Sequence, residues 1–504
     1  MRKLKKVLIA NRGEIACRII RACNEFGIET VAVYSEADRN QPHVRMADEA
    51  YPIGPSPARE SYLCLDKLIE VAKLSGADGV HPGYGFLAEN EEAVEAFEAN
   101  GVIWIGPPSR AIRLMGDKLT ARATVSAAGL PIVPGTGKTK RMTDDELIES
   151  APKIGFPLLV KAAAGGGGKG MRIIRHPGEL REGVRVARLE ADASFGDDRV
   201  YLERLITNAR HIEIQILGDQ HGNLIHLGER DCSIQRRHQK LIEECPSPAV
   251  SEALRHEMGA AAVKAAQAVG YYSAGTVEFV LDNKTHEYFF LEMNTRLQVE
   301  HTVTERVTGV DIVKEMLRVA SGERLRYRQE DIQWKGSTIE CRILAENPWS
   351  NFMPSIGLIT SLTAPSGPGV RVDTGISVGS EITPFYDSLI AKLVVWDETR
   401  EEAIIRTQQA LREFQIVGIQ TTIPFFLQML ETPEFRSGEI HTKFVEDEFL
   451  LKKTRNEELE KVAAVASALI AHMRRGRATT LEHAGGLPSA WRLLGRRNAV
   501  GGRL

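Results

Sequence analysis

The sequence has few cysteines and no long apolar run. Its six cysteines are scattered, and none belongs to a Cys-x-x-Cys pair, which argues against both a disulfide framework and a cysteine-based zinc site. No stretch approaches the roughly 18 continuous apolar residues that a membrane-spanning helix needs. The apolar run behind the basic N-terminus, residues 7–10, is too short for a signal peptide. We therefore expect a cytoplasmic protein without a membrane span.

Neither sign of charge is in large excess. The 504 residues carry 64 Lys and Arg against 67 Asp and Glu, a net charge of −3, so the total charge does not indicate a nucleic-acid partner. Hydrophobic residues make up 43% and charged residues 26%, which excludes a disordered, collagen-like or coiled-coil chain. At roughly 150 residues per domain, the length predicts about three domains.

The first hundred residues alternate strand-like and helix-like patterns. Apolar runs predict short buried strands at residues 6–10, 30–34, 78–81 and 102–105. Apolar residues at helical spacing lie between them, over residues 15–26 and 62–74. This alternation predicts an α/β domain with a doubly wound parallel sheet. The turn Asn11-Arg-Gly-Glu14 lacks the Gly-x-Gly-x-x-Gly pattern, so the domain resembles a dinucleotide-binding fold without its phosphate-binding loop.

Two glycine-rich segments compete as nucleotide-binding loops. Gly137-Lys-Thr139 imitates the end of a P-loop, but Ile132 stands where that pattern requires its first glycine. In the second segment, residues 157–174, an apolar strand that carries Lys161 runs into four consecutive glycines and then into another strand. Glycines let backbone amides approach phosphate oxygens closely. We therefore predict a glycine-rich flap on a hairpin, with Lys161 as a fixed cation beside the phosphates.

A second hairpin is predicted over residues 276–282 and 288–294, with residues 283–287 as its turn. The register then pairs three sets of residues: Asp282 with Tyr288, Val280 with Phe290, and Glu278 with Glu292. Two carboxylates directly opposite each other destabilise a sheet unless a cation lies between them. With the amide oxygen of Asn294, Glu278 and Glu292 form a set of hard ligands that suits Mg²⁺.

A basic segment, Arg236-Arg-His-Gln-Lys240, lies upstream of this hairpin. It lacks the interleaved aromatic residues of single-strand nucleic-acid binders, and the surrounding chain is not basic. Beside a metal–phosphate site, we interpret it as a binding site for small anions.

These segments together resemble the biotin carboxylases of the ATP-grasp superfamily. The resemblance covers residues 1 to about 450 and rests on segments 9–15, 81–87, 115–118, 165–168, 236–240, 292–301 and 340–342. It implies an N-terminal doubly wound parallel-sheet domain at 1–115 and a central ATP-grasp domain at 116–330, with a mobile glycine-rich lid at 131–203. A C-terminal α+β domain at 331–450 and a basic tail at 451–504 would follow.

The resemblance also implies the nucleotide and metal sites. The lysines that contact phosphate are Lys118 and Lys161, with Gly167 and Gly168 in the flap above them. The remaining ATP-binding residues are Met171, Glu203, Arg204, Leu205, Ile206, His211, Gln235 and His238. The family usually has Lys at the position of Arg204, a contact made largely through the backbone. The metal, Mg²⁺ or Mn²⁺, would bind Glu278, Glu292 and Asn294, as the hairpin argument also indicates.

For bicarbonate and biotin, the resemblance implies a further set of residues. Bicarbonate would bind Lys240, Arg296, Gln298 and Val299, and Glu300 would be the base that deprotonates it. Arg342 would hold the ureido oxygen of biotin, and Tyr84 lies in the segment that lines the biotin pocket. Lys240, Arg296, Glu300 and Arg342 are thus the expected catalytic residues.

The implied activity is ATP- and bicarbonate-dependent carboxylation of biotin on a separate biotin carboxyl carrier protein. The implied partners are that carrier, a second copy of the chain in a homodimer, and a carboxyltransferase subunit, with no nucleic acid or membrane. The acyl acceptor stays open among acetyl-CoA, as in fatty acid biosynthesis, propionyl-CoA and pyruvate. Two alternatives are another ATP-grasp carboxylate ligase and a non-catalytic nucleotide-binding module.

The tail differs in composition from the rest of the chain. Residues 451–504 carry 11 Lys and Arg against 4 Glu. Residues 457–473 predict one amphipathic helix, and Trp491-Arg-Leu-Leu494 combines residue types that anchor interfaces. We expect the tail to be a docking element outside the catalytic machinery, the alternative being a frayed basic extension.

Overall fold

The computed structural model describes residues 4–136, 141–164, 170–452 and 457–481, without the side chains of residues 457–460 and 474–481. The chain forms two compact units, Met1–Leu451 and Lys452–Leu504, which are described separately. Two predictions fall outside the described residues: the P-loop-like segment 137–139 and the four glycines of the flap, including Gly167 and Gly168.

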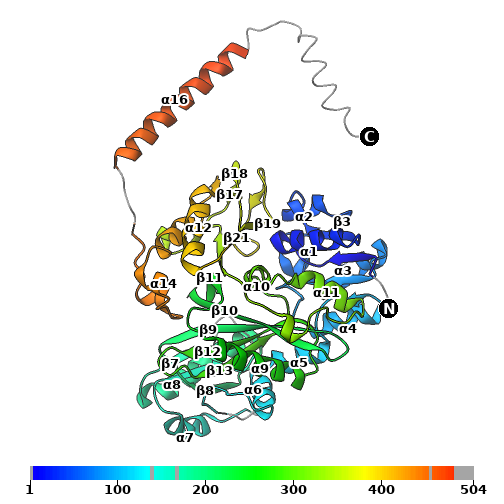
Figure 1. Ribbon diagram of the computed structural model, residues 1–504, viewed down its shortest axis with the longest axis vertical. Helices are drawn as coiled ribbons and strands as arrows, with labels where there is room; N and C mark the ends of the chain where they lie inside the picture. Colours follow the sequence, from blue (N-terminus) through cyan, green and yellow to red (C-terminus); the bar gives the residue numbers. More distant parts are fainter. Residues whose placement is uncertain (1–3, 137–140, 165–169, 453–456, 482–504) are drawn as a thin grey trace. The chain divides into compact units, whose positions relative to one another are not determined.

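The N-terminal part contains the parallel sheet that the alternating pattern predicts (Figure 1, blue). Its strands, in the order β3-β2-β1-β4-β5, are β1 (Lys6–Ile9), β2 (Glu29–Ser35), β3 (Glu49–Gly54), β4 (Gly79–His81) and β5 (Ile103–Trp104). The helices between the strands include α1 (Gly13–Glu25), α3 (Leu65–Ser75) and α4 (Glu91–Ala99). The apolar pattern did not predict β3, because this edge strand contains Pro52 and only Ile53 in it is fully buried.

A long antiparallel sheet forms the centre of the first unit. Its strands are, in order across the sheet, β13 (Tyr288–Asn294), β12 (Ser273–Asp282), β9 (Ala209–Gly218), β10 (Leu224–Arg236), β11 (Gln239–Cys245), β14 (Ser337–Leu344), β21 (Leu389–Asp397) and β19 (Val370–Thr374). The last three strands lie beyond residue 330, so one sheet crosses the domain boundary expected there. Residues of the predicted central and C-terminal domains therefore share a single surface.

The part of this sheet formed by β9 and β12 has one apolar and one polar face. Ile212, Ile214 and Ile216 of β9 are fully buried in a core cluster with α9 (Glu252–Ala268), whose inward face consists largely of alanine. The alternate residues Glu213 and Gln215 point to the opposite side, as the period of two in a strand requires. They are buried as well, so this sheet has a charged face that is closed off from water.

The β12–β13 hairpin has the predicted turn but only one of the three predicted residue pairs. Glu278 lies opposite Glu292, as predicted, whereas Val280 lies opposite Phe289 and Leu281 opposite Tyr288. The two predicted pairs nearer the turn, Val280 with Phe290 and Asp282 with Tyr288, were therefore wrong. A bulge at the Glu278–Phe279 step shifts the register by one residue. The shift pairs Phe279 with Phe290, and both side chains are completely buried.

The flap region is a small subdomain with its own sheet. The three strands β7 (Arg172–Ile174), β6 (Leu158–Ala162) and β8 (Val200–Arg204) are flanked by α7 (Asp144–Ile154) and α8 (Leu180–Phe195). Strands thus lie on both sides of the glycine-rich segment, as predicted for a hairpin flap.

The second unit contains the helix α16 (Glu457–Leu481), which extends eight residues beyond the predicted end at residue 473. Its apolar side chains Val462, Val465, Leu469, Ile470 and Met473 are each more than half exposed. The Trp491–Leu494 motif lies outside the described residues. Among the described helices of the chain, none has the length and apolar composition that crossing a membrane requires.

Candidate active site

The polar face of the long sheet places three carboxylates in a row across neighbouring strands. Glu278 on β12 lies opposite Glu213 on β9 and opposite Glu292 on β13. Like charges in this arrangement repel one another. Positively charged side chains therefore have to lie near these carboxylates, and the same sheet and neighbouring segments provide them.

Lys240, at the start of β11, supplies the main compensation. Its ammonium nitrogen lies 2.5 Å from Glu213 Oε2, 2.9 Å from Glu278 Oε1 and 2.6 Å from Glu300 Oε1. The imidazole of His211 adds a contact of 3.0 Å between its Nε2 and Glu278 Oε2. Burial alone would lower the pKa of Lys240, but the attraction of the three carboxylates raises it well above its ordinary value. Lys240 is therefore a permanent cation in this site.

Arg342 on β14 connects the charged cluster around Lys240, which consists of His211, Glu213, Lys240, Glu278 and Glu300, to an open cavity. Its Nη2 donates to Glu300 Oε2 at 2.9 Å, and its Nε donates to Glu243 Oε1 at 2.6 Å. Burial would raise the pKa of Glu300, but Lys240 and Arg342 outweigh this effect and lower it. Burial also raises the pKa of Glu243, to about 7, although Arg342 opposes the rise. Glu300 is thus ionised, with both oxygens bound by cations.

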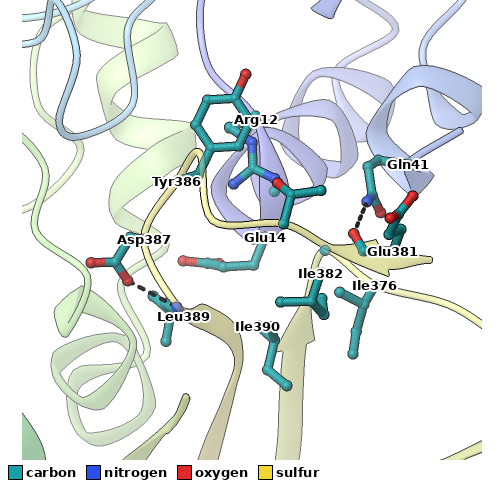
Figure 2. A pocket seen from close by; sticks show the side chains of 13 residues that line it. Arg12, Glu14, Gln41, Ile376, Glu381, Ile382, Tyr386, Asp387, Leu389 and Ile390 are labelled. Carbon is teal, nitrogen blue, oxygen red and sulfur yellow. Dashed lines mark hydrogen bonds between the residues drawn. The ribbon is translucent and has the colours of Figure 1, made fainter. Parts of the chain in front are cut away.

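The cavity next to Arg342 has a volume of about 570 Å³. Among the residues that line it are four that the resemblance assigned to bicarbonate and biotin: Tyr84, Arg296, Val299 and Arg342. Figure 2 shows the adjoining smaller pocket, where the start of α1 meets the segment that leads into β21. The two pockets share Glu14, whose carboxylate accepts a hydrogen bond from the Tyr84 hydroxyl.

The proposed metal ligands lie close together but differ in their surroundings. Glu278 accepts hydrogen bonds from Asn294 Nδ2 at 2.8 Å and from Gln298 Nε2 at 2.9 Å. The Glu292 side chain is 37% exposed, with Lys118 Nζ at 3.8 Å. The Asn294 oxygen accepts from Arg296 Nη2 at 3.0 Å. Two carboxylates and an amide oxygen on one hairpin fit a hard divalent cation, because the repulsion between Glu278 and Glu292 is only partly compensated by protein cations.

A second donor set overlaps with this one. Nitrogen and oxygen atoms of His211, Glu213 and Glu278 lie within 4.8 Å of one another. The family resemblance implied that His211 contacts the nucleotide, and it gave Glu213 no role. Glu278 is common to both donor sets.

Most of the expected ATP-binding residues come from the flap subdomain and from β9, β10 and the β10–β11 turn of the long sheet. Lys161 is buried on β6, and its Nζ lies 3.0 Å from Glu203 Oε2 on β8. Burial would lower the pKa of Lys161, but Glu203 raises it. Arg204 lies over the ring of Phe289, 5.5 Å from its centroid. Of the other expected residues, Leu205 and Ile206 follow β8, Met171 precedes β7, Gln235 lies on β10 next to His211, and His238 lies in the β10–β11 turn.

Sequence reasoning missed a fully buried arginine behind the cluster. Arg230 on β10 donates to Glu213, to Gln215 and Thr276, and also to Thr304 and Gln298. It thereby fixes Gln298, an expected bicarbonate residue, and Glu213, a partner of Lys240. The sequence around Arg230 gave no indication of this role. The role depends on the arginine side chain lying on the buried polar face of the sheet, which only the fold shows.

Comparisons with known proteins agree with this geometry. The family model of the biotin carboxylase N-terminal domain matches residues 3–112, and that of the biotin carboxylase C-terminal domain matches residues 340–447. Between them, the model of the carbamoyl-phosphate synthase L chain ATP-binding domain matches residues 117–328.

Two curated relatives and one solved structure illustrate the similarity. The chain is 56% identical over 444 residues to biotin carboxylase 1 of Bacillus subtilis, covering 88% of this chain and 98% of that protein. It is 52% identical over 445 residues to the biotin carboxylase of a Nostoc species, covering 88% and 99%. The solved structure is the biotin carboxylase domain dimer of the Hydrogenobacter thermophilus 2-oxoglutarate carboxylase, in complex with MgADP, ADP and bicarbonate. It matches this chain with a TM-score of 0.85 and 50% sequence identity, and the match covers 89% of this chain and 98% of that chain.

The central domain and its charged sheet face define an ATP-grasp ligase. Within that class, the chain belongs to the biotin carboxylase family. The expected three-part α/β fold is thereby confirmed.

Replacing Lys240 with Met should destabilise the fold by about 3–5 kcal/mol, because buried carboxylates lose their cation. It should also change the pH dependence of stability. With Lys240, the pKa of Glu300 is lowered, so its contribution is fully present above about pH 4.3 and is lost as the pH falls further. Without Lys240 the pKa of Glu300 rises toward its value in the unfolded chain, so the loss of stability below about pH 4.3 becomes smaller. Urea unfolding from about pH 3 to pH 8 measures both effects.

The matched control is Lys73→Met, because Lys73 is exposed on α3. It should leave the free energy of unfolding and its pH dependence close to those of the wild type. Equal pH profiles for the Lys240 and Lys73 variants would show that Lys240 does not compensate the buried carboxylates.

Proposed function

We propose that this chain uses ATP and bicarbonate to carboxylate biotin carried by a separate protein. The observation that supports this function best is the continuous chain of contacts from Glu278 through Lys240 and Glu300 to Arg342. It connects the candidate metal ligands to the cavity that Tyr84 lines. Carboxyphosphate is short-lived. The site where ATP and bicarbonate would form it therefore needs to lie next to the site that would hold biotin.

Glu300 is the proposed base, although its surroundings make it a weak one in the free protein. A carboxylate bound by two cations has little affinity for a proton. A bicarbonate anion that binds Arg296 and takes over the contact of Lys240 frees Glu300 Oε1 and raises the pKa of Glu300, whose other oxygen stays bound to Arg342. Glu300 then takes the bicarbonate proton, and the bicarbonate oxygen attacks the γ-phosphorus of ATP. ADP leaves, and carboxyphosphate forms.

Arg342 is proposed to act on biotin after carboxyphosphate has split into CO₂ and phosphate. The phosphate takes the proton of the ureido nitrogen, and that nitrogen attacks CO₂. The negative charge that develops on the ureido oxygen is stabilised by the guanidinium, whose planar fork offers parallel donors. Glu243 and Glu300 hold the guanidinium at Nε and Nη2, so its position is fixed before biotin arrives.

Glu278, Glu292 and Asn294 are the proposed ligands of Mg²⁺ or Mn²⁺, which when bound neutralises phosphate charge. Lys118 and Lys161 are proposed to contact the phosphates, and the segment 203–206 to contact adenine. His211, Gln235 and His238, with Met171 and the flap glycines, complete the proposed nucleotide site.

The finer partners also belong to this proposal. The relatives include subunits named for pyruvate, methylcrotonoyl-CoA, propionyl-CoA and 2-oxoglutarate carboxylases, so the acceptor stays open, with acetyl-CoA among the candidates. We propose that a carrier protein and a carboxyltransferase are the partners and that the chain forms a homodimer in the cytoplasm. The dimeric state of the Hydrogenobacter structure supports the homodimer.

Release of ADP should require bicarbonate and should be stimulated by free biotin. In Arg342→Lys, carboxylation of biotin should fall by roughly 100-fold or more, whereas the slow, biotin-independent cleavage of ATP should be largely retained, because the guanidinium acts on biotin. A coupled ADP assay with and without biotin measures both rates. An equal loss of the two rates would place Arg342 at the phosphates instead, and a wild type that ignores both bicarbonate and biotin would refute the function.

Replacing Glu292 with Gln should raise the Mg²⁺ concentration needed for half-maximal activity and lower the maximal rate. It should change the stability of the metal-free protein little, because the side chain is partly exposed and its removal also relieves repulsion with Glu278. Glu287→Gln, at the exposed turn of the same hairpin, is the control. A large loss of metal-free stability would show that Glu292 has a structural role.

Removing residues 454–504 should leave the carboxylation of free biotin near the wild-type rate. We propose that the basic tail docks onto the carrier or the carboxyltransferase, because it carries an exposed apolar helix and an excess of positive charge. Co-purification of the partners should therefore weaken and lose part of its dependence on salt. Loss of free-biotin activity would make the tail part of the catalytic core, and an unchanged complex would refute its docking role.

A further inference from the structure

A buried ion pair lies directly beneath the candidate biotin cavity. Lys392 on β21 is completely buried and is the cross-strand neighbour of Arg342. Its Nζ lies 3.1 Å from Glu14 Oε1 at the start of α1. It also donates a hydrogen bond of 2.8 Å to the backbone carbonyl of Val299. One ammonium group thus connects three parts of the chain that are far apart in sequence.

The contact with Val299 bears on the proposed base. The carbonyl of Val299 belongs to the peptide bond that leads into Glu300, and a peptide bond is planar. Holding this carbonyl therefore fixes the orientation of the backbone from which the Glu300 side chain starts. The carboxylate of Glu300 has to reach both Lys240 and Arg342, and a rotated peptide plane would misdirect it.

The contact with Glu14 bears on the other side of the cavity. The Tyr84 hydroxyl donates to Glu14 Oε1, the same oxygen that lies next to Lys392. Burial raises the pKa of Glu14, and Lys392 opposes that rise. Glu14 Oε2 is buried and has no hydrogen-bond partner among the described residues. The carboxylate is therefore held chiefly by Lys392 and Tyr84, at the junction of α1 and β21 that Figure 2 shows.

We propose that Lys392 and Glu14 are positioning residues for biotin carboxylation. Lys392 fixes the peptide plane before Glu300, and Glu14 fixes the Tyr84 hydroxyl, so the base and the cavity wall are aligned from one buried point. This inference rests on the proposed roles of Glu300 and Tyr84. Stability alone does not explain the pair, because apolar residues of similar volume often replace a buried ion pair without loss.

The test removes both charges together in Glu14→Gln/Lys392→Met, since Lys392→Met alone would leave Glu14 buried and uncompensated. We expect the double variant to bind ATP normally but to lose roughly tenfold or more in bicarbonate-dependent ADP release. The acid limb of its pH–rate profile should also move to higher pH, because a misdirected Glu300 is held less tightly by Lys240 and Arg342. A merely structural role would lower the rate without moving the acid limb.

The matched control is Glu91→Gln/Arg113→Met, which removes an exposed ion pair of the N-terminal part and should leave the rate and pH profile unchanged. If the double variant does not fold, Glu14→Asp serves instead, because it keeps both charges and only withdraws the carboxylate. It should lower the biotin-stimulated rate roughly fivefold or more while biotin-independent ATP cleavage changes less than about twofold.

Wild-type kinetics with an unmoved acid limb in the double variant would overturn the positioning role, as would an unchanged biotin-stimulated rate in Glu14→Asp. An inactive wild type in the same assay would instead refute the proposed function itself, so the two failures are distinguishable.

Discussion

Placing three carboxylates side by side on one sheet face is the constraint from which the active-site architecture follows. Glu213, Glu278 and Glu292 lie next to one another across β9, β12 and β13. Glu213 and Glu278 are buried and Glu292 is partly exposed, so water screens their mutual repulsion only in part. Lys240 relieves it on one side, and Lys118 lies near Glu292 on the other. Because Glu292 has its nearest cationic partner among the described residues at 3.8 Å, we propose that a bound cation completes the compensation on this side.

The same face shows how a fold can place charge in its interior. The alternation along β9 and β12 sends isoleucine, valine and phenylalanine to α9 and polar residues to the opposite side. The apolar face provides the favourable free energy of burial, and hydrogen bonds satisfy the polar face. Arg230, with five side-chain partners, is the clearest example. Neither face would be stable without the other.

The sequence predicted those features that depend on local periodicity or on a recognisable motif. The period of two and the length of the turn placed Glu278 opposite Glu292, and the alternation of elements predicted the N-terminal parallel sheet. The bulge was not predictable from the alternation, because it depends on burying Phe279 and Phe290 together. Arg230, Lys392 and Glu14 were also missed as members of the site, since their partners come from distant segments and only the folded sheet brings them together.

The free protein keeps the proposed catalytic groups bound to one another. Both oxygens of Glu300 are held by cations, and Arg342 has a carboxylate at two of its nitrogens. An incoming anion therefore does not enter a bare positive pocket. We propose that it competes with the Glu300 carboxylate for Lys240. Glu300 stays attached to the chain, so the site gains the negative charge of the anion, and this charge raises the proton affinity of Glu300. The basicity of Glu300 thus depends on the presence of substrate.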